Sequence, residues 1–282
     1  MPQRFEHIDG MKTGRVPSQI GAESEPKISE ELCSKAVQPL IPKIFHQIWI
    51  DFGAGKEPTS EHLEQTNRLI ALHPGWHYIL WREQEIVGLI KEHFPFFLNT
   101  FNSYDKQIKK HDSGRLVILF ALGGVYLDHD YIPVKNIEEA LGTCTFFASN
   151  EENDTFVPGI SIMGSVAKNS FFPFALHMRN LPEVATLPVL NATGPAQFAS
   201  ALKAYMKAHQ PKGFKLYHPK FFNPFSWKEG AQQIKNYTLS HVRSRFPDCF
   251  FYQSYEAAWY AEYNITRSGE QKSTSPLSSL TN

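Results

Sequence analysis

The stretch KQIKKHDSGRLVILFALGGVYLDHDYIP, from Lys106 to Pro133, decides the fold. Its first half has the spacing of a helix, and Gly123-Gly124 form the kind of stop at which helices end. The residues from Val125 to Asp128 are rich in β-branched and aromatic side chains, as strands are. The stretch therefore predicts a helix, a tight turn and a strand.

The same alternation continues on both sides of this stretch. Short apolar runs, such as Ile44 to Ile50 and Trp76 to Trp81, are separated by longer segments with helical spacing. This pattern indicates an α/β fold. Residues 1–38 and 268–282 are polar and have no periodicity, so we expect disordered tails on either side of one domain at residues 39–267.

The balanced charge of the chain argues against some partners and locations. The 28 Lys and Arg match the 28 Asp and Glu, whereas nucleic-acid binding favours a basic excess, so we expect no nucleic-acid partner. The longest apolar run, Leu116 to Leu127, is too short to span a bilayer, and the first thirty residues lack a signal-peptide core. We therefore expect no transmembrane segment and a cytoplasmic protein, with delivery elsewhere by another route left open.

The cysteines are odd in number and far apart. Cys33, Cys144 and Cys249 therefore predict neither a disulfide framework nor a metal site, and a reducing compartment fits them best. Four Asn-x-Thr triplets begin at residues 153, 191, 236 and 264, and they are acceptors for glycans only in a secretory lumen. With no targeting signal found, we interpret the four triplets as chance.

The helix of this stretch carries two charges on its apolar side. On a helical wheel, Asp112 and Arg115 fall within the stripe formed by Ile108, Leu116 and Leu119. Residues three apart on a helix can touch, so we expect an inward-facing pair. One interpretation is a structural ion pair. The other is a site for a polar ligand, since burying a pair often costs more than it returns.

Two acids follow the strand. Asp128 and Asp130 stand where a hydrophobic strand ends, and the carboxyl edge of an α/β sheet is where ligands bind. Their oxygens suit a hard divalent cation, Mg²⁺ or Mn²⁺. An exposed acidic turn is the alternative. Trp49 ends the first expected strand and offers a flat face for a nucleobase, although a core position is as reasonable.

Taken in order, these motifs resemble the DXD-containing glycosyltransferases of family 32 and, more distantly, the glucosyltransferase domains of large glucosylating toxins. The resemblance covers about residues 40–260. It rests on IPKIFHQIW (Ile41 to Trp49), Trp81, the D-x-x-R of Asp112 and Arg115, GGVYLDHD (Gly123 to Asp130) and TGP (Thr193 to Pro195).

The resemblance implies a GT-A type nucleotide-sugar-binding fold with a central mixed sheet flanked by helices. It further implies a metal-dependent, retaining hexosyltransferase that uses a UDP- or GDP-sugar donor, Mn²⁺ or Mg²⁺, and an acceptor that is a protein, lipid or glycan. The residues that it assigns are Asp128 and Asp130 for the metal, Asp128, Asp130 and Arg115 for catalysis, and Ile48, Trp49, Asp112, Arg115, Tyr126, Asp128 and Trp259 for substrate.

The chain departs from the family pattern at two places. His111 stands where relatives carry Ser before the D-x-x-R motif, and the C-terminal His expected near Gln253 and Ser254 is missing. Ser254, Glu256 or water are the alternatives for the third metal ligand. Because this His is missing, a sugar-nucleotide-binding protein without turnover is an alternative function. A Mg²⁺-dependent phosphohydrolase is a more remote alternative, because its active site also contains an Asp-x-Asp motif.

Overall fold

The structure is a computed structural model that describes residues 26–36, 38–50, 57–225, 234 and 236–255. Its strands are β1 (Ile28–Ser29), β2 (Ile44–Ile48), β3 (His77–Trp81), β4 (Gly124–Leu127), β5 (Tyr131–Pro133), β6 (Phe146–Asn150), β7 (Pro158–Ser165), β8 (Phe214–Tyr217) and β9 (Phe251–Gln253). Its α-helices are α1 (Ser60–Leu72), α2 (Glu83–His93), α3 (Leu98–Ser103), α4 (Gln107–Leu122), α5 (Glu138–Leu141), α6 (Phe171–Arg179), α7 (Pro182–Ala185), α8 (Val189–Ala192), α9 (Pro195–His209) and α11 (Leu239–Arg245). Two short 3-10 helices are η1 (Pro95–Phe97) and η2 (Pro219–Phe221).

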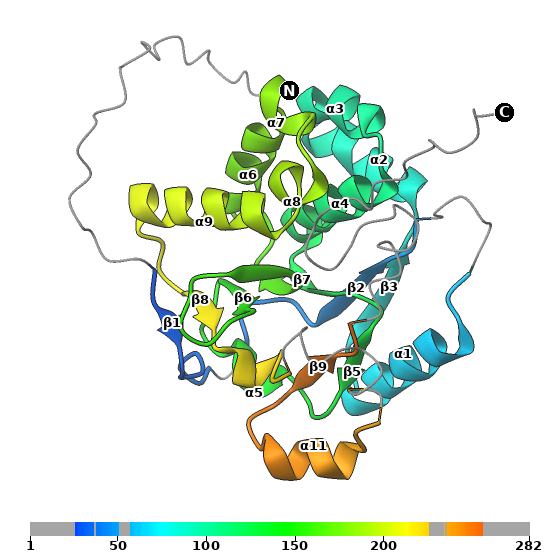
Figure 1. Ribbon diagram of the computed structural model, residues 1–282, viewed down its shortest axis with the longest axis vertical. Helices are drawn as coiled ribbons and strands as arrows, with labels where there is room; N and C mark the ends of the chain where they lie inside the picture. Colours follow the sequence, from blue (N-terminus) through cyan, green and yellow to red (C-terminus); the bar gives the residue numbers. More distant parts are fainter. Residues whose placement is uncertain (1–25, 37, 51–56, 226–233, 235, 256–282) are drawn as a thin grey trace, which may run out of the picture.

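Seven strands form one mixed sheet in the order β1-β8-β6-β7-β4-β2-β3. Strand β7 is antiparallel to both of its neighbours, and the other pairings are parallel. A second, two-stranded sheet pairs β5 with β9. Figure 1 shows α2, α3, α4 and α6 to α9 on one side of the large sheet, with α1, α5, α11 and the small sheet on the other. The expected α/β architecture, a central mixed sheet flanked by helices, is confirmed.

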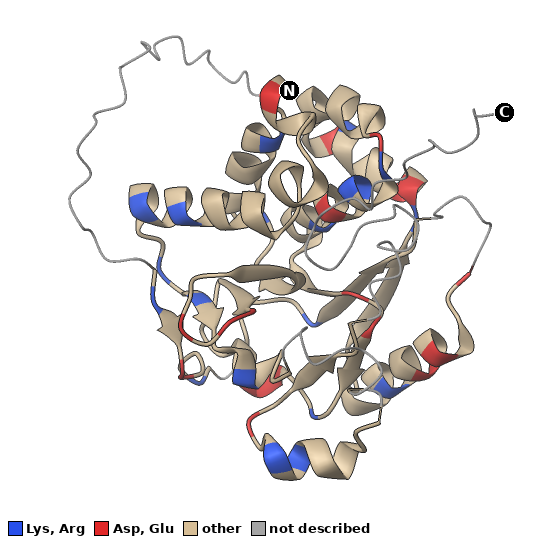
Figure 2. Ribbon diagram, viewed as in Figure 1, with Lys and Arg blue, Asp and Glu red and all other residues tan. Residues whose placement is uncertain are grey.

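Each side of the large sheet has its own apolar core. The first joins α2, α3, α4, α6 and α9 to the sheet, and the second lies beneath α1 and α5. Lys and Arg are mixed with Asp and Glu over the outer helices of both layers (Figure 2). Among the described residues, no helix combines the length and apolar character needed to cross a bilayer.

The predicted helix, turn and strand are present as α4, Gly123-Gly124 and β4. Both glycines have positive φ angles, of 67° and 93°. His46 holds the turn: its Nδ1 accepts from the indole of Trp81, so its Nε2 donates to the Gly123 carbonyl at 2.8 Å. Burial lowers the pKa of His46 to about 4, which keeps the ring neutral in this role.

Replacing Gly124 by Ala should therefore destabilise the protein. The added Cβ would lie 2.6 Å from the Ile44 carbonyl oxygen, in a backbone conformation that alanine disfavours. We expect a loss of about 2 kcal/mol or more in unfolding free energy, measured by urea denaturation. Gly88→Ala is the control, because its Cβ would meet nothing within 4 Å inside α2. If both variants were as stable as the wild type, the turn would not be under this constraint.

Two expectations about the N-terminal region are wrong. Residues 26–36 are ordered rather than part of a tail, because β1 pairs in parallel with β8 at the edge of the sheet. Cys33 forms a disulfide with Cys144, whose Cα lies 5.7 Å away although 111 residues separate them in sequence. Spacing along the chain could not show this approach, since the fold alone brings the two residues together. The expectation of a cytoplasmic, reducing compartment is therefore not confirmed.

Candidate nucleotide-sugar site

The parallel pairing of β2 with β4 brings the predicted site together. Phe45 and His46 of β2 pair with Val125 and Tyr126 of β4, so both strands end at the same edge of the sheet. Trp49 follows β2 and the acidic residues follow β4. The Trp49 ring lies edge to face with His129, with ring centroids 5.1 Å apart. Trp49 therefore lies beside the Asp128 to Asp130 motif.

Arg115 of α4 joins the helix to the acidic strand end. Its Nη2 lies 3.1 Å from Asp112 Oδ1 and 3.5 Å from Asp128 Oδ1, and its Nη1 donates to the Ile160 carbonyl at 2.7 Å. The side chains of Asp112 and Arg115 are only 5% and 3% exposed, as the inward-facing wheel position predicts. Arg115 thus contacts two acids: the buried Asp112, and Asp128, which is 29% exposed and faces the edge of the sheet.

The protonation states of Asp128, Arg115 and Tyr126 follow from their burial and from the charges around them. Burial raises the pKa of Asp128, and the adjacent Arg115 guanidinium opposes that rise. Burial alone would lower the pKa of Arg115, but the combined influence of Asp128, Tyr126, Asp112 and Asp130 outweighs it and raises the pKa above its usual value. Burial also raises the pKa of Tyr126 well above 10, so its hydroxyl stays protonated and donates to Asp128 Oδ1 at 2.5 Å.

Asp130 is held by the second sheet. Strand β9 pairs with β5 and places Gln253 opposite Tyr131, so that the Gln253 amide donates to both Asp130 carboxylate oxygens at 3.1 Å. The backbone N–H of Ser254 donates to the Asp130 carbonyl at 2.8 Å. Gln253 therefore stands against Asp130 at the position where the family pattern expects His.

The donor set fits a hard divalent cation. Asp128 and Asp130 supply carboxylate oxygens on partly exposed side chains, and Gln253 would add an amide oxygen if its terminal group were rotated. Within the described part of the chain, no cluster of three or more His, Cys, Asp or Glu side chains is placed to hold a metal. A cation here would thus take its remaining oxygen ligands from the ligand or from water.

Two residues that the sequence analysis did not assign complete the network behind the site. Thr193, of the TGP motif, donates from its hydroxyl to Asp112 Oδ2 at 2.9 Å. Arg179 of α6 is fully buried and donates to the carbonyls of Asp112 and Thr193, and to Gln197 Oε1 at 2.8 Å. The TGP motif was a weak signal for Thr193. A single arginine in a helix gives no signal for Arg179.

His111, the departure from the family pattern, supports the segment that carries Trp49. The Ile50 N–H lies 3.3 Å from His111 Nε2. Burial, together with the nearby Arg115 charge, lowers the pKa of His111 to about 3, so the ring is neutral. A neutral imidazole thus ties the end of β2 to α4.

Two further residues assigned to substrate binding are buried. Ile48 is 1% exposed, and its side chain packs in the core. Tyr126 is also 1% exposed and contacts Asp128 rather than lining an open pocket. Trp259 lies outside the described residues, as do Glu256 and the predicted tail at 268–282.

Glu151, just after β6, is a further acid that the sequence analysis missed. Burial raises its pKa to about 7, and the charges of Glu152 and Asp128 add to the rise. The structure therefore adds a carboxyl group that titrates near neutral pH within electrostatic reach of Asp128. Its position after an unremarkable strand gave no signal in the sequence.

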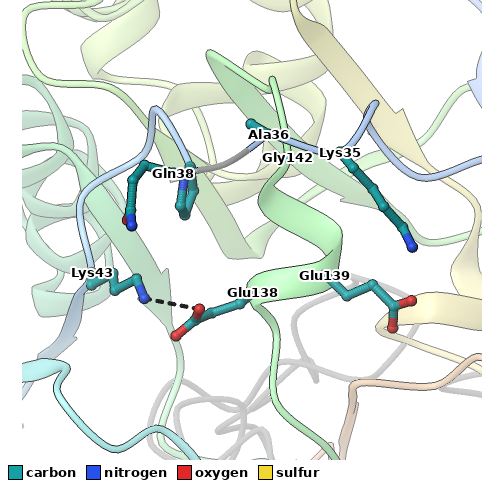
Figure 3. Close-up of a pocket in the computed structure, with 8 residues that line it drawn as sticks. Lys35, Ala36, Gln38, Lys43, Glu138, Glu139 and Gly142 are labelled. Carbon is teal, nitrogen blue, oxygen red and sulfur yellow. Dashed lines mark hydrogen bonds and ion pairs between the residues drawn. The ribbon is translucent and has the colours of Figure 1, made fainter.

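A separate cavity of about 330 Å³ lies elsewhere (Figure 3). Lys35, Gln38 and Lys43 line one side and Glu138 and Glu139 the other, with an ion pair of 2.8 Å between Lys43 and Glu138. Because Lys43 precedes β2 whereas Trp49 follows it, the cavity is at the opposite end of that strand from the acidic site.

Comparison with known proteins agrees with this geometry. Residues 59–147 match the model of the family described as "Glycosyltransferase sugar-binding region containing DXD motif". The matched segment runs from α1 into β6 and includes Asp112, Arg115, Tyr126, Asp128 and Asp130.

Two relatives come from Saccharomyces cerevisiae. The chain is 28% identical to "Mannosyl phosphorylinositol ceramide synthase CSH1" and 30% identical to "Mannosyl phosphorylinositol ceramide synthase SUR1", each over 78% of this chain. The matches cover 63% and 62% of those proteins, so the chain spans less than two thirds of their length. Among solved structures, "PaToxG Glycosyltransferase" has a TM-score of 0.49 and 17% identity, covering 60% of this chain and 70% of that one.

The family match and the assembled residues coincide. The segment that the family describes carries the acidic pair after β4 together with the arginine that contacts it. Residues 59–147 of this chain are therefore similar to the glycosyltransferase sugar-binding region that contains a DXD motif.

Proposed function

We propose that the chain is a metal-dependent glycosyltransferase that moves a hexosyl group from a nucleotide-sugar to an acceptor. The observation that carries the proposal is the contact of Arg115 with Asp128. It places the buried guanidinium group of Arg115 behind a DXD motif at the carboxyl end of β4. Mg²⁺ or Mn²⁺ bound there would neutralise negative charge on the departing nucleoside diphosphate.

Each residue of the network has a defined part in this proposal. Asp130 would bind the metal directly, with its carboxylate oriented by Gln253. Asp128 would face the metal and the sugar, with its carboxylate oriented by Tyr126 and Arg115. Such preorganised groups stabilise developing charge without rearrangement during the reaction.

The relatives suggest the sugar and the acceptor class. Both yeast proteins are named as synthases of mannosyl phosphorylinositol ceramide. We therefore propose mannose as the transferred hexose and a phosphoinositol-bearing sphingolipid as the acceptor. From the family resemblance we also propose that the anomeric configuration is retained, with the acceptor attacking the face from which the diphosphate leaves.

The test is a panel of UDP- and GDP-sugars with purified protein. Thermal shift with and without Mn²⁺ would report binding, and release of nucleoside diphosphate would report turnover. We expect a GDP- or UDP-hexose to raise the melting temperature only with metal and to be cleaved. A donor that binds but is never cleaved, with any lipid acceptor tried, would favour a binding protein without turnover.

Trp49→Ala should mainly weaken donor binding. A base stacked on an aromatic ring contributes about 1–3 kcal/mol, so we expect the dissociation constant for the donor to rise roughly ten- to a hundredfold. Isothermal titration in the presence of Mn²⁺ would measure it. Phe96→Ala is the control, because Phe96 is an exposed aromatic residue next to α3. Unchanged donor affinity in the Trp49 variant would exclude the stacking role.

Gln253→Ala should weaken metal binding. Removing the amide frees the Asp130 carboxylate to change rotamer, and loss of such an orienting partner costs about 10- to 100-fold in metal affinity. Titration of Mn²⁺ followed by nucleoside diphosphate release would measure the change, with Gln253→His as the variant that should restore affinity. Tighter binding by the alanine variant would mean that the amide competes with the metal instead.

A further inference from the structure

The Cys33–Cys144 disulfide ties the N-terminal segment to the core. Cys33 is 6% exposed and Cys144 is fully buried, and the Tyr217 hydroxyl lies 3.4 Å from Cys144 Sγ. Strand β1 itself pairs with β8 over two residues at the edge of the sheet. The third cysteine, Cys249, is fully buried. Such a cysteine arrangement is typical of proteins that fold in an oxidising compartment, because cytosolic thiols reduce disulfides.

The Asn-x-Thr triplets exceed what composition produces. The acceptor triplet takes Ser or Thr at its third position, and the chain has 13 Asn, 13 Thr and 21 Ser among 282 residues, so a random order would contain about 1.6 acceptor triplets, against the four present. The triplet is the acceptor sequence for N-linked glycans, which are attached only in a secretory lumen. The excess and the disulfide are independent properties of the chain, and they indicate the same compartment.

In two of the triplets, both the asparagine and the threonine are exposed. Asn153 and Thr155 lie on the surface of the loop between β6 and β7. Asn236 and Thr238 lie on the surface just before α11, where the Thr238 hydroxyl accepts from the His241 N–H at 3.2 Å. A bulky glycan on either asparagine would extend into solvent without displacing a packed side chain.

The remaining two triplets carry less weight. Asn191 is exposed, but its partner Thr193 is fully buried against Asp112, so the family motif already explains that threonine. Asn264 lies outside the described residues.

We propose that the chain folds in the lumen of the secretory pathway, where Cys33 and Cys144 are oxidised and Asn153 and Asn236 receive N-linked glycans. In the oxidation, a disulfide-bearing thiol oxidase takes up the two electrons and two protons of the thiols. In the glycosylation, each asparagine amide nitrogen bonds to the anomeric carbon of a lipid-diphosphate-linked oligosaccharide. The amide loses a proton, and the bond from that carbon to the lipid diphosphate breaks with the electron pair leaving on the diphosphate.

The direct test uses the protein isolated from its source cells, with thiols alkylated before lysis. Peptide N-glycosidase digestion in ¹⁸O water converts each glycosylated asparagine to a labelled aspartate, which mass spectrometry locates. We expect label at residues 153 and 236, and a disulfide-linked peptide pair containing Cys33 and Cys144. Unlabelled Asn153 and Asn236, or alkylated Cys33 and Cys144, would overturn the proposal.

Variants made in the full chain and expressed in the same cells test the sites separately. Asn153→Gln and Asn236→Gln should each remove one glycan-sized step of mobility on a denaturing gel, which does not depend on folding. Thr238→Ser is the matched control, since it keeps both the acceptor triplet and the hydroxyl that caps α11, and its mobility should be unchanged. Glutamine variants that migrate like the wild type would show that these sites are not used.

Discussion

Asp130→Ala is expected to lower metal-dependent release of nucleoside diphosphate by roughly a thousandfold. The substitution removes a carboxylate that the Gln253 amide holds at the carboxyl edge of the sheet. Asp128, which Tyr126 and Arg115 hold in place, would then be the single carboxylate of the motif left to the metal. Initial rates at saturating donor over a range of Mn²⁺ concentrations would measure the effect.

Asp154→Ala is the matched control for this variant. Asp154 is an exposed aspartate in the loop after β6, and its loss should leave the rate unchanged. Excess Mn²⁺ should not rescue Asp130→Ala. Wild-type turnover by Asp130→Ala in Mn²⁺ would refute both the metal site and the proposed reaction.

Arg115→Met is expected to destabilise the fold by about 3–5 kcal/mol, because it leaves Asp112 and Asp128 without their shared cation. Methionine keeps most of the apolar stem, so the loss measures the charge more than the packing. Urea denaturation followed by circular dichroism would give the free energy of unfolding. Arg245→Met, an exposed arginine of α11, should change it by less than about 0.5 kcal/mol.

Two further measurements separate the electrostatic origin from a packing defect. Adding Asp112→Asn to Arg115→Met should recover part of the loss, because one buried negative charge disappears. Lowering the pH should also stabilise Arg115→Met relative to the wild type. Burial raises the pKa of Asp128, so the folded variant binds a proton more tightly than the unfolded chain. If neither the Asp112→Asn substitution nor the lower pH reduced the loss of stability, the charge argument would be contradicted.

The sequence predicted the helix, the glycine turn and the strand of residues 106–133 because those signals are local. Helical spacing, positive-φ glycines and β-branched residues act within a few neighbours, and α4 and β4 begin and end close to the predicted positions. The inward-facing Asp112 and Arg115 were predictable for the same reason, since residues three apart on a helix share a face. The assignment of Asp128 and Asp130 to a metal stays a prediction.

Contacts between distant segments could not be predicted in this way. Thr193, Arg179 and Gln253 reach the site through the packing of α6, α8 and β9, at sequence distances for which composition and periodicity carry no information. The same limit explains why the ordered residues 26–36 and the Cys33–Cys144 disulfide were missed.

The sequence by itself determined the α/β alternation, the helix, turn and strand of residues 106–133, the acidic pair after β4 and the charged pair on α4, because backbone preference and side-chain periodicity are properties of consecutive residues. Only the tertiary structure decided that Arg115 joins Asp112 to Asp128, that Gln253 holds Asp130 and that Cys33 meets Cys144. These contacts depend on which strands become neighbours in the sheet, and strand order is set by burial of the whole apolar surface rather than by any short stretch of residues.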